Sequence, residues 1–467
     1  MALSQALHTL TLPLTEAQIE GDQKLHLQDL QGNILKGHGR NHSAHVFITF
    51  KAGQATKVKA WIKKAASEHR FIDAYKQLKD ATDFKKTGKN GGIFEVFFIS
   101  AKGYTYLGQD VTNFDTPFKN GLRGSIATLN DTLVNDWDAE LKHEFHAMIL
   151  IADIRQANVH FLAKELQIEL AQLADMQIVF GDQQKNERGD GIEHFGYVDG
   201  RSQPLMLEEG IAGESDGTTL WDPAVGPKLV LIADPLGKPK SSGSYFVFRK
   251  LEEKVKAFKT QEQTLATQLG LIGDARELAG AYVIGRFEDG TPVTLSDEPM
   301  IEKSTEPNGG SVPNNFDYRA DLDGAKCPFQ GHIRKSNPRG SGPGGLVDEN
   351  SRRMARRGIT YGVRTDDFSD INTMPEGGVG LLFMAYQRSI ADQFEFIQKN
   401  WVNNESFPKL GVGIDPVLGQ NPVQTSQKWT KTWGDASQTV SFNFRDFVKM
   451  RGGEYFFSPS LSSLAMF

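Results

Sequence analysis

The 467-residue chain contains a single cysteine, Cys327. One thiol cannot form an intrachain disulfide, and metal sites that need several cysteines, such as cysteine-rich zinc centres and iron–sulfur clusters, are excluded. A chain without disulfides fits a reducing compartment. Cysteine usage therefore predicts an intracellular protein whose metal chemistry, if any, rests on other ligands.

Membrane and export signals are also missing from the sequence. No uninterrupted apolar run reaches the roughly 18 residues that indicate a membrane span. Residues 1–22 lack the basic segment and the apolar stretch of a secretory signal. These absences predict a cytoplasmic protein with no membrane partner.

Positive charge is not in excess either. The chain has 52 Lys and Arg against 58 Asp and Glu, a formal charge of -6. A general nucleic-acid-binding protein usually carries a basic excess, so no nucleic-acid partner is expected. A small-molecule partner fits this charge balance better.

The residues that are present fit a large globular protein with many loops. Hydrophobic residues make up 39% of the chain, and 47 glycines and 19 prolines interrupt it. At roughly 100 to 200 residues per domain, the length favours two domains. Each domain would have enough apolar material for a core of its own.

The N-terminal part of the chain shows an ordered pattern of strands and helices. Apolar runs rich in β-branched and aromatic residues predict four strands. Helical spacing predicts a helix after the first strand and another after the third. The expected strands are 44–50, 92–100, 146–154 and 176–182, and the expected helices are 57–69 and 156–174. This order is the ferredoxin-like arrangement, with residues 101–145 as a long insertion.

A second copy of this pattern follows further along the chain. Residues 244–266 again pass from a strand into a lysine-rich helix, and residues 380–401 again pass from a strand into a helix. The similarity is limited to the order of strands and helices, and two unrelated halves of the same fold type would also share that order. We therefore predict an α+β fold of two ferredoxin-like modules, each an antiparallel sheet with helices packed on it. The predicted modules are residues 1–205 and 206–467, with 205–243 as a linker.

The segment CPFQGHIRKSNPRG, residues 327–340, places His332 beside three cations. A lone histidine in a loop is most often a hydrogen-bonded structural residue, and the cations alone fit a solvated surface loop. Haem iron, however, needs only one protein ligand, and its propionates would bind cations such as Arg334, Lys335 and Arg339. No paired-histidine spacing supports a conventional zinc site.

Two further segments carry polar residues in apolar surroundings. In HFGYVDGRSQP, residues 194–204, Asp199 precedes Gly200, and an Asp-Gly pair is most simply a tight turn. In RRMARRGITYG, residues 352–362, four arginines lie within six residues. A charged helix end explains that cluster as well.

Taken together and in order, these motifs resemble those of the dye-decolourising peroxidases. The motifs are GYVDG (196–200), CPFQGHIRKSNPR (327–339), ARRGITYG (355–362), GLLFMAYQ (380–387) and GGEYFF (452–457). Residues 29–40, DLQGNILKGHGR, are similar to the N-terminal segment of the longer members of that family. The resemblance spans about residues 29 to 457. It implies haem b held mainly by the second module and facing the domain interface.

By motif position, the resemblance assigns one face of the haem to the second module. His332 looks like the proximal ligand of the iron, and Arg339 would meet a propionate. Asp415, in the segment 413–420, is similar to the carboxylate that takes the ring N–H of the proximal histidine. A turn before Pro416 is the alternative interpretation of this aspartate.

The resemblance assigns the other, distal face to both modules. Asp199 looks like the acid–base residue and Arg356 like the distal arginine, with Leu381 and Phe383 lining that side. One ionised carboxylate can take a proton from one oxygen of hydrogen peroxide and return it to the other. A guanidinium would stabilise the charge that develops on the departing oxygen. The pocket is therefore expected between the modules.

Bulky reductants would need a route for electrons from the surface. Trp401, at the end of the helix after the strand that carries Leu381 and Phe383, is the first candidate for an electron relay, although core packing is the simpler explanation of a tryptophan there. Three aspartates at 366, 367 and 370 could bind a cation such as manganese, but a solvated loop accounts for them too.

The leading hypothesis is a haem peroxidase that reduces hydrogen peroxide and oxidises dyes, phenolic compounds and similar one-electron donors. A non-enzymatic haem-binding or haem-handling protein is the alternative, and it would need His332 but not both Asp199 and Arg356. A haem-free ferredoxin-like binding protein would leave the His332 segment unexplained. The sequence leaves the reducing substrate and the oligomeric state open.

Overall fold

The computed structural model describes residues 5–213, 220–301, 313–422 and 426–467. Within these residues, ten strands form one antiparallel sheet whose main path runs β4-β1-β3-β2-β12-β6-β9-β7. β5 (Ile232–Ala233) pairs with β6, and β8 (Ile359–Tyr361) pairs with β9. A separate two-stranded ribbon consists of β10 (Gln427–Thr432) and β11 (Asp435–Phe442).

The first half of this sheet is the N-terminal ferredoxin-like module. It is built from β1 (His42–Phe50), α3 (Ala55–Ser67), β2 (Phe94–Ile99), β3 (Ala147–Asp153), α7 (Gln156–Leu170) and β4 (Ala174–Asp182). The strands lie in the order β4-β1-β3-β2. All four predicted strands and both predicted helices are confirmed, and one further helix, α4 (Ala74–Thr87), precedes β2.

The second half repeats the same order with different strands. Its elements are β6 (Ser242–Glu253), α9 (Val255–Leu269), β7 (Ala355–Arg356), β8, β9 (Gly380–Gln387) and β12 (Val448–Ser458). The spatial order β12-β6-β9-β7 matches β4-β1-β3-β2 of the first module. The helix predicted after β9 forms as two π-helical segments, η8 (Ile390–Glu395) and η9 (Ile397–Val402). The expected two-module α+β fold is therefore confirmed.

The two modules share one sheet whose outer strands also meet. β2 joins β12 through Ile99 and Phe457. At the other side, the Thr360 hydroxyl of β8 donates to the carbonyl of Asp182 at 2.5 Å and accepts from the amide of Gln184 at 2.8 Å. The sheet therefore curls back on itself around an apolar interior.

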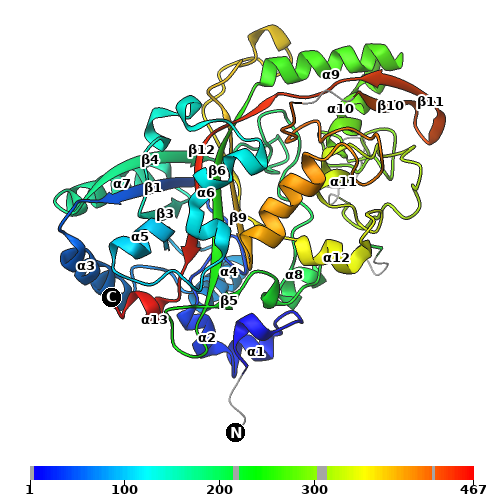
Figure 1. The fold of residues 1–467 in the computed structure, drawn as a ribbon. Helices are drawn as coiled ribbons and strands as arrows, with labels where there is room; N and C mark the ends of the chain where they lie inside the picture. Colours follow the sequence, from blue (N-terminus) through cyan, green and yellow to red (C-terminus); the bar gives the residue numbers. More distant parts are fainter. Residues whose placement is uncertain (1–4, 214–219, 302–312, 423–425) are drawn as a thin grey trace.

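Fully buried side chains at alternate strand positions fill that interior, as the period of two in a strand requires. They include Phe47, Val96, Phe98, Met148, Leu150, Phe246, Phe248, Leu382, Met384, Tyr386 and Phe456. The opposite sheet face packs against helices. Figure 1 shows α3, α5 (Ala101–Tyr106) and α7 on one side of the molecule, and α9, α10 (Glu277–Ile284) and α11 (His332–Ser336) on the other.

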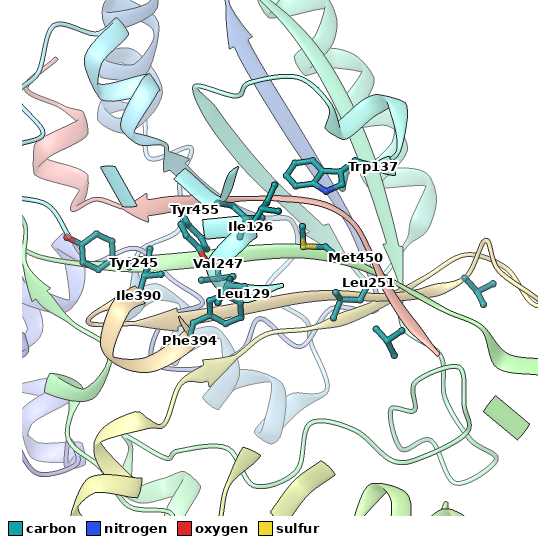
Figure 2. Close-up of a cluster of buried hydrophobic side chains, with 14 of the residues drawn as sticks. Ile126, Leu129, Trp137, Tyr245, Val247, Leu251, Ile390, Phe394, Met450 and Tyr455 are labelled. Carbon is teal, nitrogen blue, oxygen red and sulfur yellow. The ribbon is translucent and has the colours of Figure 1, made fainter. Parts of the chain in front are cut away.

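The predicted insertion, residues 101–145, covers the second module. Its helix α6 (Thr116–Leu129) lies on β6 and β12, and Figure 2 shows Ile126 and Leu129 among side chains of these two strands. The amide of Leu122 donates to a Glu454 carboxylate oxygen of β12 at 3.0 Å. The insertion also contains α5, η2 (Val134–Asp136) and η3 (Ala139–Leu141).

The prediction that 205–243 is a linker is wrong for its described part. This stretch contains α8 (Glu208–Ala212), η4 (Pro227–Leu229) and β5, and residues 214–219 lie outside the described residues. Met206, Leu207, Val230 and Leu231 are buried in the interior cluster because apolar residues flank the Gly- and Pro-rich segments. The boundary between residues 205 and 206 stays a prediction.

Shorter elements complete the described chain. They are η1 (Leu7–Thr9), α1 (Glu16–Glu20), α2 (Lys24–Asp29), η5 (Gly273–Arg276), α12 (Gly345–Arg352), η7 (Ile371–Thr373) and α13 (Leu461–Leu464). No helix in the described ranges is long and apolar enough to cross a membrane.

Candidate active site

His332, the first residue of α11, is paired with a buried carboxylate. Its Nδ1 lies 2.9 Å from Asp415 Oδ2, and Asp415 is completely buried. The other Asp415 oxygen accepts backbone N–H bonds from Val417 at 2.8 Å and Leu418 at 2.9 Å. A carboxylate held in this way accepts the Nδ1 proton, so the lone pair of the imidazole is on Nε2.

The Nε2 atom of His332 is available to a ligand. It has no hydrogen-bond partner in the part of the chain that the structure describes, and a quarter of the side chain, 25%, is exposed. Burial lowers the pKa of His332, but Asp415 raises it by more, so that the net pKa lies above its ordinary value. The charges of Arg356 and Asp199 also act on this pKa, which shows that both lie within electrostatic reach of the imidazole.

The structure gives two of the three neighbouring cations other partners. Arg334 is fully buried and donates to Asp321 Oδ2 at 2.7 Å. The Lys335 ammonium donates to the carbonyls of Asn404, Phe407 and Gly413 at 2.8, 2.6 and 2.5 Å. The expectation that these two cations would bind propionates is therefore wrong. Both bind groups inside the protein, and the sequence did not reveal these partners.

Arg339 is the remaining cation, and it is buried without a carboxylate partner among the described residues. Its guanidinium donates to the Ser202 hydroxyl at 2.5 Å and to the Asn314 side-chain oxygen at 2.8 Å. The rings of Trp221 and Phe316 both lie 3.9 Å from its Cζ. Burial holds the Arg339 pKa well below its usual range. Its Nε is buried and has no hydrogen-bond partner within the described ranges.

Arg356, in β7, shares a sheet face with the two residues expected to line the distal side. β7 pairs Arg356 with Ala385 of β9. Because side chains alternate along a strand, Ala385 points to the same face as Leu381 and Phe383, and opposite partners share a face. Leu381 and Phe383 are partly exposed, whereas their neighbour Leu382 is fully buried in the interior. The register therefore brings Arg356, Leu381 and Phe383 to one surface.

Asp199 lies on a segment that the second module holds in place. The Arg356 guanidinium donates to the carbonyl of Arg201 at 2.8 Å, and the Arg356 amide donates to Gln203 Oε1 at 3.0 Å. Burial lowers the pKa of Arg356, and the Asp199 charge opposes that effect. Asp199 itself is exposed, and its carboxylate makes no hydrogen bond to any described residue. The carboxylate is therefore free to exchange a proton with a small ligand.

Trp401 lies close to the His332 and Asp415 pair. It is only 4% exposed, stacks on Phe407 with ring centroids 5.1 Å apart and meets Phe396 edge-on at 5.6 Å. The carbonyl of the next residue, Val402, accepts from the amide of Asp415 at 3.0 Å. A surface pocket of about 210 Å³ has Trp401, Phe396, Phe407 and Asn400 among its lining residues.

The aspartates considered for a cation are bonded within their own loop. Asp366 accepts a hydrogen bond from Arg364 at 3.0 Å, and Asp367 and Asp370 accept from groups two residues further on. No group of three or more metal-ligating side chains occurs in the described residues. The Asp366 side chain is only 4% exposed in its ion pair with Arg364, so the solvated-loop interpretation does not fit this residue and fits only Asp367 and Asp370.

Two family models match this chain. One, described as the DyP dimeric alpha+beta barrel domain, covers residues 29–180, and the other, the C-terminal part of the Dyp-type peroxidases, covers residues 208–409. The curled α+β sheet is thus that of a peroxidase. The chain belongs to the dye-decolourising peroxidase family.

Several characterised relatives extend over nearly the whole chain. The multifunctional dye peroxidase DyP2 of Amycolatopsis sp. is 39% identical over 97% of this chain and 98% of its own length. Its solved structure gives a TM-score of 0.90 at 38% identity and covers 99% of this chain and 100% of that one. A DyP-type peroxidase of Anabaena sp. gives 0.87 at 38% identity, with 96% of both chains covered.

These comparisons confirm three of the expectations from the sequence: the family, the α+β fold and a peroxidase function acting on dyes. Because the family is one of haem peroxidases, haem is its cofactor. No comparison supports the alternative of a non-enzymatic haem-binding protein. Sequence reasoning missed Ser202, Asn314 and Gln203, although Ser202 and Gln203 lie in the same motif as Asp199.

Proposed function

We propose that this chain is a haem b peroxidase that uses hydrogen peroxide to oxidise dyes and phenolic compounds one electron at a time, with His332 as the ligand of the iron. The His332–Asp415 pair carries this proposal, because it presents an unpartnered Nε2 within electrostatic reach of Asp199 and Arg356. A cytoplasmic location remains our prediction from the lone cysteine.

The residues of the site suit a haem group. His332 Nε2 would bind the iron, and Arg339 offers a buried cation with an unpartnered Nε to a propionate. Leu381 and Phe383 provide the apolar surface on the distal side. Haem, when bound, supplies the redox centre at which the O–O bond of peroxide is cleaved. Asp415 strengthens the basicity of His332, which favours that cleavage.

Asp199 moves the proton. Hydrogen peroxide must lose a proton from one oxygen and gain one on the other, so that water leaves. The exposed, unpaired Asp199 carboxylate can accept the first proton and deliver it to the departing oxygen.

Arg356 provides the positive charge that the departing oxygen needs. Its guanidinium keeps one bond to the Arg201 carbonyl, which fixes its position relative to the segment that carries Asp199. A preorganised cation in a partly buried site stabilises developing negative charge more strongly than water does. Asp199 and Arg356 thus act on the same transition state from different modules.

Trp401 would carry electrons from reductants that cannot enter the site. Its ring lines a surface pocket, while its neighbour Val402 bonds the Asp415 backbone. A short path therefore runs from the pocket to the carboxylate behind His332. The stacking on Phe407 also makes Trp401 part of a small buried cluster.

A double-mutant cycle tests the roles of Asp199 and Arg356. The readout is the rate at which the haem absorbance band changes on mixing with peroxide. Asp199→Asn should slow this step about 10² to 10⁴-fold, and Arg356→Leu about 10² to 10³-fold. The double variant should lose less than the product of the two effects, because both residues serve one step. Exposed Asp136→Asn and Arg155→Leu are controls; near wild-type rates in both site variants would refute the assignment.

A further inference from the structure

Glu193 closes the turn that leads to Asp199. One of its carboxylate oxygens accepts the amide of Phe195 at 2.5 Å, and the other accepts the amide of Tyr197 at 3.0 Å. The Glu193 carbonyl accepts the amide of Gly196 at 3.0 Å. One glutamate thus sets the backbone path of the residues immediately before Asp199.

Glu253 holds the same turn from the second module. It is the last residue of β6, is 4% exposed, and accepts the amide of His194 at 2.9 Å. The two glutamates bind consecutive backbone amides, those of His194 and Phe195, so their carboxyl groups meet at one turn, and the Glu193 carboxyl raises the pKa of Glu253. Two carboxyl groups in contact cannot both ionise easily, so a hydrogen bond between them requires a shared proton. Burial raises the pKa of Glu193 to about 7 and that of Glu253 well above its ordinary value, and the Glu193 carboxyl group raises the Glu253 pKa further.

Other charged and titratable groups also face the pair. Asp199 raises the pKa of both glutamates, so its charge interacts with their carboxyl groups. Lys259 of α9 lowers the pKa of Glu193 but is itself paired with Glu262 at 3.1 Å and with Glu288. Tyr197 and Tyr361 have their pKa values raised by burial first, and also by Glu193 and Glu253 respectively. His194, whose backbone the pair binds, has its pKa lowered by burial to about 4 and is neutral.

We propose that Glu193 and Glu253 share one proton and act together as positioning residues for Asp199. This inference rests on the proposed function, in which Asp199 moves the proton of peroxide. With one proton between them, the two carboxyl groups bond each other and three backbone amides of the turn. Loss of that proton places two negative charges side by side at the base of the turn, next to a third on Asp199. The repulsion displaces the Asp199 segment, and the reaction with peroxide then slows on the alkaline side.

Glu193→Gln and Glu253→Gln test this pair while keeping its shape. In Glu253→Gln the amide oxygen still accepts the His194 N–H, and in Glu193→Gln it keeps one of the two backbone N–H bonds. In both variants the amide NH₂ donates to the remaining carboxylate without needing a shared proton. The exposed Glu165→Gln on α7 is the matched control. Each variant is compared with the wild-type holoenzyme from about pH 5 to about pH 9.

The first readout is the infrared absorption of protonated carboxyl groups, which does not depend on turnover. The wild type and Glu165→Gln should keep a protonated carboxyl band at pH values well above those of an ordinary glutamic acid and lose it only when the second carboxyl group, Glu253, also ionises, at a pH above the Glu193 pKa of about 7. Both site variants should lack this band over the same range. A band that is absent from the wild type, or that survives in both variants, would overturn the shared proton.

The second readout is the pH profile of the peroxide reaction. The wild type should show an alkaline decline that both Gln variants lack. A merely structural brace would lower the rate evenly without moving this decline, and that outcome would refute the positioning role. Failure of the proposed function is distinguishable, because Asp199→Asn would then react at the wild-type rate whatever the two glutamates do.

Discussion

Arg339 donates a 2.5 Å hydrogen bond to the hydroxyl of Ser202, three residues beyond Asp199. Arg339 follows His332 by seven residues, so one guanidinium joins the segment of the proposed iron ligand to the segment of the proposed acid–base residue. Arg339, the proposed propionate ligand, therefore also helps to fix the position of the segment that carries Asp199.

Replacement of Arg339 should weaken haem binding and slow the reaction with peroxide at once. Arg339→Met removes a buried cation and its bond to Ser202, so haem should dissociate about 10 to 100-fold faster, the range that loss of a charge-assisted hydrogen bond implies. Ser202→Ala should retain haem and slow only the reaction with peroxide. Haem transfer to an excess of a scavenger protein measures the first effect. Equal haem loss in Arg339→Met and Arg155→Leu would argue against the propionate contact.

Asp415 should control the electronic character of His332. Asp415→Asn keeps an oxygen for the amides of Val417 and Leu418, so the loop should fold, but the negative charge behind the imidazole is lost. We expect a higher iron reduction potential, because a less basic histidine stabilises the ferric state less. Spectroelectrochemical titration measures this shift. His332→Ala should instead lose haem or change its coordination, and an unchanged spectrum would remove His332 from its role.

Lys335 should matter for stability more than for chemistry. Lys335→Met leaves three buried carbonyl oxygens without their donor, at a cost of about 2 to 4 kcal/mol in the free energy of unfolding. Exposed Lys164→Met on α7 is the control and should cost little. Denaturant unfolding of the two variants measures the difference. A cost below that of the control would show that the ammonium is not needed by the 404–413 loop.

Glu193 makes the stability of the fold depend on pH. An unfolded glutamate releases its proton near 4.5, whereas Glu193 in the folded chain releases it near 7. Between these values the folded state binds more protons than the unfolded state, so the contribution of Glu193 to the free energy of unfolding falls as pH rises through this window and levels off above it. Glu193→Gln should flatten that slope. Denaturant titrations at several pH values would contradict this account if the slope persisted.

The sequence predicted the fold well where the signal was local. The strands at 44–50 and 146–154 are continuous apolar runs, and any central strand of a buried sheet shows such a run. It did not reveal that β2 and β12 join the modules, because that contact involves one pair, Ile99 and Phe457, far apart in the chain. Pairing between distant segments leaves no periodic trace in either one.

The same limit applies to the site. His332 was found because a histidine among cations is unusual, and the Asp415 contact was anticipated only through the family resemblance. Glu193 and Glu253 went unnoticed because glutamates at a turn and at a strand end normally face solvent. Only the packing of β6 under the turn before Asp199 buries them together. The local sequence signal therefore identifies single residues, while burial and partners decide what those residues do.

Trp401→Phe should separate oxidation of bulky dyes from the reaction with peroxide. Phenylalanine keeps the stacking on Phe407 but is much harder to oxidise than tryptophan, so turnover of a bulky dye should fall while the change in haem absorbance on mixing with peroxide stays fast. Because Trp401 is 4% exposed and lies in a buried cluster, the substitution also leaves a small cavity, and unfolding measurements must show that the variant is folded. Trp429→Phe, a fully buried tryptophan outside this cluster, is the matched control and should not alter the ratio of the two rates. If dye turnover and peroxide reactivity fall together in Trp401→Phe, the ring serves packing alone.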